Sequence, residues 1–271
     1  MKSLLRCTLF LFLFLGVLGV GFGQDFKCGT PRPTPKEYQE MIKFNQEFDK
    51  QKSLQIKQGR VQATQLTVKV KVHIVRRSIP SNGIYVTVAQ LNDIFITLRS
   101  KLNVYPLNVS LEYLPEIDYI DDDFYYYYGN IDSVKENQMC NNRDATNAVN
   151  LYFVGTLTGA GGYAYNPYNG RKYNRIVIPT VDNSNSSSFN YNLKASVPHE
   201  FGHYFNLLHT FDNPAGPDIL SLERVNGNNC SISGDLVCDT NADPYVSSIG
   251  SCKRYNYLTG HCFWGGISNV V

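Results

Sequence analysis

The residues best suited to chemistry in this sequence are three histidines and a glutamate in the stretch 199–209, which reads HEFGHYFNLLH. On a helix, His199 and His203 lie four residues apart and project from one face, where two neutral imidazoles can bind one zinc ion. Glu200 lies beside that face and can take a proton from a water molecule that attacks a peptide carbonyl. The pattern predicts a zinc hydrolase site with Glu200 as its general base.

A third protein ligand is needed, because a catalytic zinc ion takes three and keeps one position open. His209 supplies it if the helix ends after Phe205 and the chain turns back. Glu223 is a rival, since one class of zinc peptidase uses a downstream glutamate in this role. We favour His209, whose spacing requires no further helix.

Pro198, directly before the motif, leaves two ways for the helix to begin. Ser196 can cap a helix that has Pro198 in its first turn. If the helix begins earlier, Pro198 lies inside it and bends it. In both cases His199 and His203 share one face.

The elements that must position this site alternate between strand and helix patterns. Apolar and polar residues alternate over 66–75 and 107–114, as in strands, and residues 87–102 have apolar side chains at helical spacing. Short apolar runs at 150–154 and 175–179 predict two further strands, with a glycine-rich loop or bulged edge between them. This order indicates an α/β domain.

The first 23 residues are typical of a secretory signal peptide. Lys2 and Arg6 precede an apolar core that is shorter than the roughly 20 residues a membrane span needs, and small residues follow it. Removal of 1–23 would place the chain outside the cell without a membrane anchor. It would also leave equal numbers of basic and acidic residues.

The whole chain has 271 residues, of which 43% are hydrophobic and 18% charged, with a formal net charge of +2. This is a globular composition. The near-zero charge argues against a general nucleic-acid binder or a polybasic membrane binder. The oligomeric state is left open.

Residues 24–60 look separate from the rest of the chain. A proline-rich stretch at 28–35 leads into one polar helix at 37–55 and a basic joint at 57–60. Two interpretations stay open: a docked N-terminal arm, or a pro-segment that is removed at this joint. Residues 61–271 would then form the catalytic domain.

Six cysteines remain once Cys7 is removed with the signal peptide. Four lie in an irregular region with little local core, which two disulfides would order; they are Cys230, Cys238, Cys252 and Cys262. Four cysteines allow three pairings. The remaining Cys28 and Cys140 either pair, or Cys28 supplies a thiolate as a fourth zinc ligand that displaces the water.

The motif at 199–203, the His-Thr-Phe at 209–211 and the Gly-Asp and Cys-Asp-Thr element at 234–240 together resemble the pappalysin-type metzincins, a group that includes pappalysin, ulilysin and cytophagalysin. The resemblance covers roughly residues 66–271, and the Cys-Gly-Thr at 28–30 is also similar to secreted microbial members. It implies a secreted zinc endopeptidase that acts on proteins or peptides. The implied fold has an upper subdomain, with a twisted, mostly parallel sheet and two long helices, and an irregular disulfide-bonded lower subdomain, with the zinc between them.

The resemblance also assigns residues. It implies zinc ligation by His199, His203 and His209, with Glu200 as base. It favours the interleaved disulfides Cys230–Cys252 and Cys238–Cys262. It implies calcium as a second cofactor in the loops beyond the third histidine, where the candidate ligands are Asp212, Asp235, Asp239 and Asp243.

Two departures from the family pattern stand out. Asn206 occupies the turn position where the family has glycine, and asparagine is the next most tolerant residue for a left-handed backbone. The family's methionine-containing turn after the third histidine has no counterpart, because all three methionines precede the motif. We expect either a chain truncated at its C-terminus, or a secreted zinc-binding remnant with impaired catalysis or a binding protein that lacks this turn.

Overall fold

The computed structural model describes residues 28–58, 66–102, 109–165, 174–180, 189–209, 223–224, 226–238, 254–256 and 261–263. The predicted signal peptide, the basic joint beyond residue 58, Cys252 and the candidate calcium ligands Asp212, Asp239 and Asp243 lie outside the described residues.

A six-stranded, mostly parallel sheet lies at the centre of the fold. Its strands are β1 (Leu66–Arg76), β2 (Val109–Tyr113), β3 (Asp118–Asp121), β5 (Val149–Val154), β7 (Tyr163–Ala164) and β8 (Arg175–Pro179). Their order is β2-β1-β5-β8-β7, with β3 also paired to β1. The strand β7 lies at one edge and runs antiparallel to β8. The predicted α/β class is confirmed.

The burial of these strands follows from their sequences. In β1, the alternating Val70, Val72 and Ile74 are buried on one face of the sheet. In β5, every side chain is buried. A strand buried on both faces is typical of a parallel sheet with helices on both sides.

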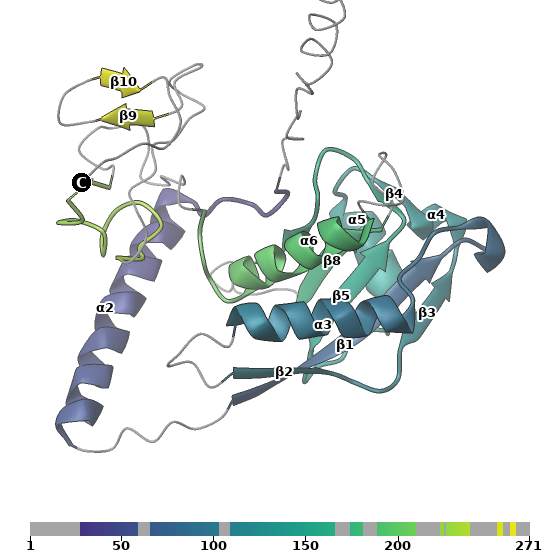
Figure 1. The fold of residues 1–271 in the computed structure, drawn as a ribbon, viewed down its shortest axis with the longest axis horizontal. Helices are drawn as coiled ribbons and strands as arrows, with labels where there is room; N and C mark the ends of the chain where they lie inside the picture. Colours follow the sequence, from purple (N-terminus) through teal and green to yellow (C-terminus); the bar gives the residue numbers. More distant parts are fainter. Residues whose placement is uncertain are drawn as a thin grey trace, which may run out of the picture.

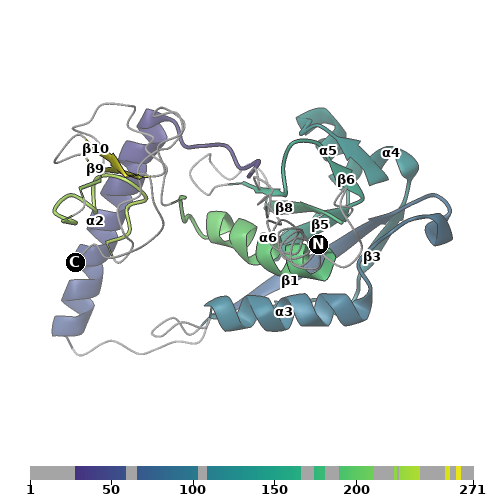
Figure 2. The same ribbon diagram turned by 45° about the horizontal axis from the view of Figure 1, so that its top comes forward.

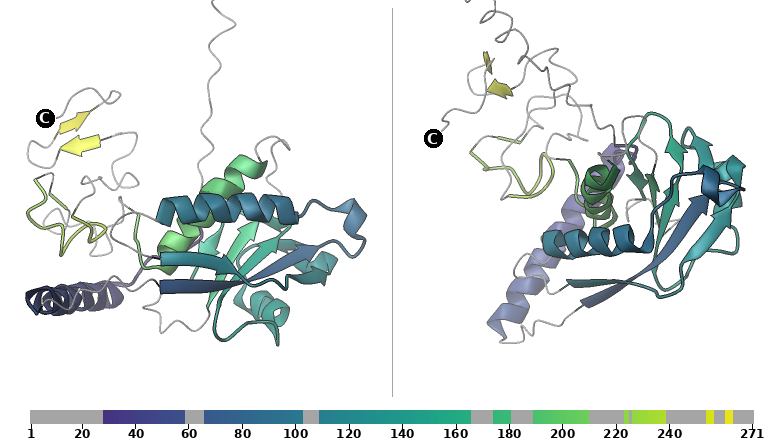
Figure 3. Two further views of the ribbon diagram at one scale, coloured as in Figure 1. Left: turned by 60° about the horizontal axis from the view of Figure 1, so that its bottom comes forward. Right: turned by 45° about the vertical axis from the view of Figure 1, so that its right-hand side comes forward.

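Helices cover both faces of the sheet and complete the layers (Figures 1 and 3). The helices α3 (Val88–Leu102) and α6 (Phe189–Tyr204) pack against each other and against one face. The shorter α4 (Asp123–Tyr126) and α5 (Ser133–Cys140) carry residues of the core cluster on the other face. A short 3-10 turn, η1 (Pro80–Asn82), and a small pair of strands, β4 (Tyr127–Gly129) and β6 (Thr156–Leu157), complete this region.

The long helix α2 (Pro35–Lys57) lies away from the sheet, beside the segment 223–238 (Figures 1 and 2). It begins with a capping box: the Glu37 carboxylate accepts a hydrogen bond from the Thr34 N–H at 2.6 Å, and the Thr34 hydroxyl accepts one from the Glu37 N–H. Tyr38, Met41 and Ile42 of its first turns are buried in a small cluster with Leu236. The predicted polar helix of the N-terminal segment is therefore confirmed, and its first turns are docked.

The segment 226–238 is built of turns and a disulfide, and two short strands come after it, β9 (Arg254–Asn256) and β10 (His261–Phe263). The disulfide joins Cys230 to Cys238, with the two Cα atoms 5.0 Å apart. The interleaved pairing with Cys252 and Cys262 is therefore wrong. Positive φ angles at Gly234 and Leu236 turn the chain back on itself, which brings two cysteines only eight residues apart into contact.

Candidate zinc site

Helix α6 carries the first half of the zinc motif, in which His199 is exposed and His203 is buried. Leu193, Val197, Phe201 and Tyr204 are buried against the sheet and α3. Their spacing of three or four residues fixes the rotation of the helix, so that His199 and His203 face away from the core. Their Nε2 atoms lie 3.2 Å apart. The predicted pairing of these imidazoles on one helical face is confirmed by the geometry.

The helix begins earlier than a cap at Ser196 would place it. It starts at Phe189, so Pro198 lies inside it. Proline has no N–H to donate to the carbonyl four residues before it, so this helix lacks one backbone hydrogen bond just before the metal motif. Of the two ways to begin the helix, the longer one is correct.

The end of the helix turns the chain back toward His209. The Leu207 N–H donates to the Gly202 carbonyl and the Asn206 N–H to the His203 carbonyl, both at 2.8 Å. These two bonds form a Schellman motif, whose turn residue is left-handed. Asn206 takes that position with φ of 76°. The sequence prediction that asparagine replaces glycine here is confirmed.

Asn206 should therefore be replaceable by glycine but not by alanine. In Asn206→Ala we expect the free energy of unfolding to fall by about 1 kcal/mol, because a left-handed backbone crowds a Cβ and alanine lacks the short polar side chain that makes asparagine tolerant of this conformation. Asn206→Gly should be at least as stable as the wild type, since the Asn206 Oδ1 atom is buried without a partner among the described residues. Chemical denaturation of the three proteins measures this. Equal stability of the alanine and glycine variants would contradict the assigned turn.

The turn completes a cluster of three imidazoles. The Nε2 atom of His203 lies 3.2 Å from that of His199 and 3.2 Å from that of His209. The Cys28 Sγ lies 3.3 Å from the same Nε2 atom, and the ligand atoms of all four residues lie within 4.8 Å of one another. Tetrahedral zinc with Zn–N and Zn–S bonds of ordinary length spaces its ligand atoms about 3.3–3.6 Å apart. The donor types suit zinc, and the three contacts of the His203 Nε2 atom, at 3.2–3.3 Å, have close to this spacing.

The protonation of His203 supports the same conclusion. Its Nδ1 atom lies 2.8 Å from the Leu207 carbonyl oxygen, which can only accept, so Nδ1 carries the proton. The neutral Nε2 then presents a lone pair to the other two Nε2 atoms. Burial, and secondarily the charge of His209, lower the pKa of His199, which favours its neutral form. The unprotonated Nε2 of His203 is the form in which an imidazole ligates a metal ion.

Glu200 is fully buried beside this cluster. Its Oε2 accepts a hydrogen bond of 2.8 Å from the Thr30 hydroxyl, and its Oε1 lies 3.6 Å from the Cys28 Sγ. Burial raises the pKa of Glu200 to about 7, against the opposing effect of these hydrogen bonds. Gly162 lies against its side chain: a Cβ on this glycine would be 3.0 Å from the Glu200 Cγ.

The segment Cys28-Gly29-Thr30 occupies the site. The Gly29 N–H donates to the Gly162 carbonyl at 2.8 Å, and the Ala164 N–H donates to the Thr30 hydroxyl at 2.9 Å. Cys28 and Cys140 are both free thiols, and Cys140 is buried elsewhere, so the alternative of a Cys28–Cys140 disulfide is wrong. Sequence reasoning missed Thr30 and Gly162. The thiol two residues before Thr30 was the one signal for it.

Glu223 is not brought to the zinc motif. It lies buried beside Gly234, and burial together with Asp235 raises its pKa to about 7. It does not belong to the cluster formed by Cys28 and the three histidines, so the rival assignment of Glu223 as third ligand is wrong. Asp235 is also buried and accepts a hydrogen bond of 3.0 Å from the Val237 N–H. Nothing in the described residues supports calcium there.

The fold and this site can now be set beside known proteins. The family model described as pregnancy-associated plasma protein-A matches residues 132–257, a range that contains His199, Glu200, His203 and His209. The chain carries a pappalysin-type metalloprotease domain. The resemblance noted in the sequence is thereby confirmed, and the chain is a zinc metalloendopeptidase of this type.

Two fungal relatives are similar to this chain over most of its length, and a third is similar over a shorter part. An extracellular metalloprotease of Podospora anserina is 27% identical over 83% of this chain and 74% of its own length. One from Neurospora crassa is 27% identical over 83% and 73%, and one from Colletotrichum graminicola is 38% identical over 37% and 33%. Among solved structures, a mutant of Tannerella forsythia promirolysin has a TM-score of 0.46 at 16% identity, covering 80% of this chain and 77% of its own. In the part of the pappalysin-type chain that the structure describes, no helix is both long and apolar enough for a membrane span.

Proposed function

We propose that this metalloprotease is a secreted zinc endopeptidase in which His199, His203 and His209 hold the metal and Glu200 is the general base. The observation that carries the proposal is the convergence of three Nε2 atoms beside one buried carboxylate. Three histidines leave a fourth zinc position open, which is the arrangement of a catalytic rather than a structural site. The names of the fungal relatives support an extracellular location.

The chain's own residues divide the chemistry between them. Zinc, when bound, lowers the pKa of water and polarises the carbonyl of the peptide bond. Glu200 takes the proton from the attacking water at its carboxylate and passes it to the leaving amine, as a general base that later acts as an acid. The Leu207 carbonyl accepts a hydrogen bond from the His203 Nδ1–H, which keeps the Nε2 of that ligand free of a proton and correctly oriented.

We also propose that residues 24–60 are a pro-segment that holds the enzyme latent. Cys28 would supply a thiolate at the fourth zinc position, which excludes the water. Thr30 donates to the Glu200 carboxylate, so the general base is engaged as well. Two consecutive obstacles, one at the metal and one at the base, support inhibition rather than a purely structural arm. Residues 61–271 are then the catalytic domain.

Removal of the metal should abolish activity reversibly. We expect the protein secreted from an expression host, once processed, to cleave casein or a quenched peptide, and to lose this activity in 1,10-phenanthroline. One equivalent of zinc should restore it, whereas calcium or magnesium should not, since an imidazole site selects zinc over hard cations. Full activity in a sample that contains less than a tenth of an equivalent of zinc would sink the proposal.

A further inference from the structure

The short edge strand β7 forms the wall of the site next to Glu200. It consists of Tyr163 and Ala164 alone and pairs with β8 through both residues. The Gly162 carbonyl and the Ala164 N–H, at either end of this wall, are the groups that bind Gly29 and Thr30. A peptide substrate that replaces the segment 28–30 meets the same two main-chain groups. Their position therefore matters for binding.

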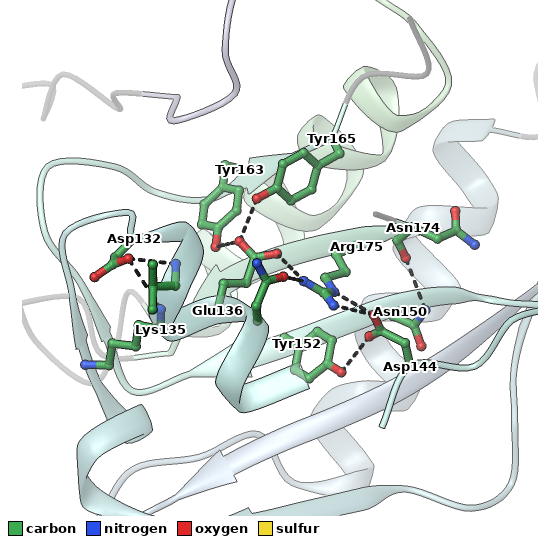
Figure 4. A network of polar contacts seen from close by, with 12 residues as sticks. Asp132, Lys135, Glu136, Asp144, Asn150, Tyr152, Tyr163, Tyr165, Asn174 and Arg175 are labelled. Atoms are coloured by element: carbon green, nitrogen blue, oxygen red, sulfur yellow. Dashed lines mark hydrogen bonds and ion pairs between the residues drawn. The ribbon is translucent and has the colours of Figure 1, made fainter. Parts of the chain in front are cut away.

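The other face of this strand is anchored on a buried carboxylate. Side chains alternate along a strand, so Tyr163 and Tyr165 point to the same side, opposite to Ala164. Both hydroxyls donate to the Glu136 Oε2 atom, at 2.8 and 2.7 Å. Figure 4 shows the two tyrosine side chains converging on Glu136. Glu136 belongs to α5, which carries part of the core on the sheet face away from the zinc helix.

The anchoring group is the Glu136 carboxylate, and the groups that contact it are hydrogen-bond donors. The Arg175 Nη1 lies 3.0 Å from the Glu136 Oε1, and the Arg175 Nε donates to Asp144 at 2.7 Å. Glu136 has no exposed surface and Arg175 is only 5% exposed. Hydrogen bonds from an arginine to a carboxylate are among the strong ones in proteins. Burial, and then the charge of Glu136, raise the pKa of Tyr163 and Tyr165, so both phenols stay protonated as donors.

The cost of this arrangement argues that it does more than stabilise the fold. A buried ion pair is often no more stable than apolar residues of the same volume. The ladder of β7 is only two residues long, so it fixes the strand weakly by itself. Directional hydrogen bonds to one fixed carboxylate hold the strand at a defined height, which apolar packing would not do.

We propose that Glu136 is a positioning residue for the substrate: through Tyr163 and Tyr165 it holds β7 so that the Gly162 carbonyl and the Ala164 N–H can bind the main chain of a peptide. This inference rests on the proposed endopeptidase function. Glu136 lies behind the strand, contacts neither substrate nor metal, and acts through the two tyrosines.

The test compares KM and kcat for peptide cleavage in variants of this anchor. For Tyr165→Phe and for Glu136→Gln we expect KM to rise about 5- to 10-fold with kcat within about 2-fold, because a loosened binding strand weakens binding more than it alters the reacting groups. The double variant should be little worse than Glu136→Gln alone, because both changes break one contact. Tyr126→Phe is the matched control: its buried hydroxyl bonds to Ile84, away from β7. It should lose stability without a change in KM.

A second measurement keeps the inference testable if a variant is poorly active. In the full chain, hydrogen exchange at the Ala164 amide should be about 10-fold faster in Tyr165→Phe than in the wild type, with exchange at Leu151 unchanged. An unchanged KM in folded Tyr165→Phe and Glu136→Gln, or unchanged exchange at Ala164, would overturn the inference. If the wild type cleaves no peptide, the proposed function fails, and the exchange measurement alone decides whether Glu136 anchors the strand.

Discussion

Glu200→Gln is expected to lose about 10²- to 10⁴-fold in the rate of peptide hydrolysis while it keeps one zinc ion per chain, since this is the range that a positioned general base contributes. Glutamine has nearly the same shape but cannot take a proton from water. None of the three histidines changes, so the metal should stay bound. Steady-state kinetics together with metal analysis of the same sample measure both quantities.

The matched control is Glu223→Gln. Glu223 is the second buried glutamate with a pKa raised to about 7, and the sequence allowed it as a zinc ligand. Because it lies outside the cluster of metal-binding atoms, this variant should retain zinc and most of its activity. A Glu200→Gln protein that cleaves as fast as wild type, or a Glu223→Gln protein that loses zinc, would show that the two glutamates have been assigned the wrong roles.

Local patterns in the sequence were enough to predict the longer elements of the fold, although not short ones such as β3 and α5. Alternation over 66–75 predicted β1, and helical spacing over 87–102 predicted α3, because each pattern reports which face of a single element is buried. The start of α6 was harder to predict. Pro198 resembles a first-turn residue, yet tertiary packing of Leu193 and Val197 extends the helix to Phe189. Packing against the sheet outweighed the local preference of proline.

The grouping of the three histidines was predictable for the same reason. His199, His203 and His209 lie within one helix and its turn, so their spacing alone brings them together. Thr30 contacts Glu200 across a separation of 170 residues, and no local pattern encodes that contact. The disulfide was predicted wrongly for the opposite reason, because its two cysteines are close in the sequence. The pairing of Cys230 with Cys238 depends on turns at Gly234 and Leu236, and the family resemblance directed attention to more distant partners.

Replacement of Cys28 should release the latent enzyme. In the full chain with residues 24–60 still attached, we expect Cys28→Ala to cleave a short quenched peptide about 10²- to 10⁴-fold faster than the wild type, which is the usual advantage of a tethered ligand over a free one. The reason is geometric: the Cys28 Sγ lies 3.3 Å from the His203 Nε2, where it would close the fourth position of a zinc ion held by the three histidines. Initial rates should be measured before any processing, with the intact chain length checked by mass spectrometry.

Two further variants separate the effect of the Cys28 thiol on latency from the effects of the other thiol and of Thr30. Cys140→Ala removes the other free thiol, which is buried away from the site, and should leave the precursor latent. Thr30→Val keeps the thiol but removes the hydroxyl that engages Glu200, so it should activate the precursor less than Cys28→Ala does. If Cys28→Ala stays as inactive as the wild type while Thr30→Val is active, the inhibition acts on the general base and not on the metal. If neither variant is active until residues 24–60 are removed, the segment blocks the site by its bulk, and the Cys28 thiol is not the group that keeps the precursor inactive.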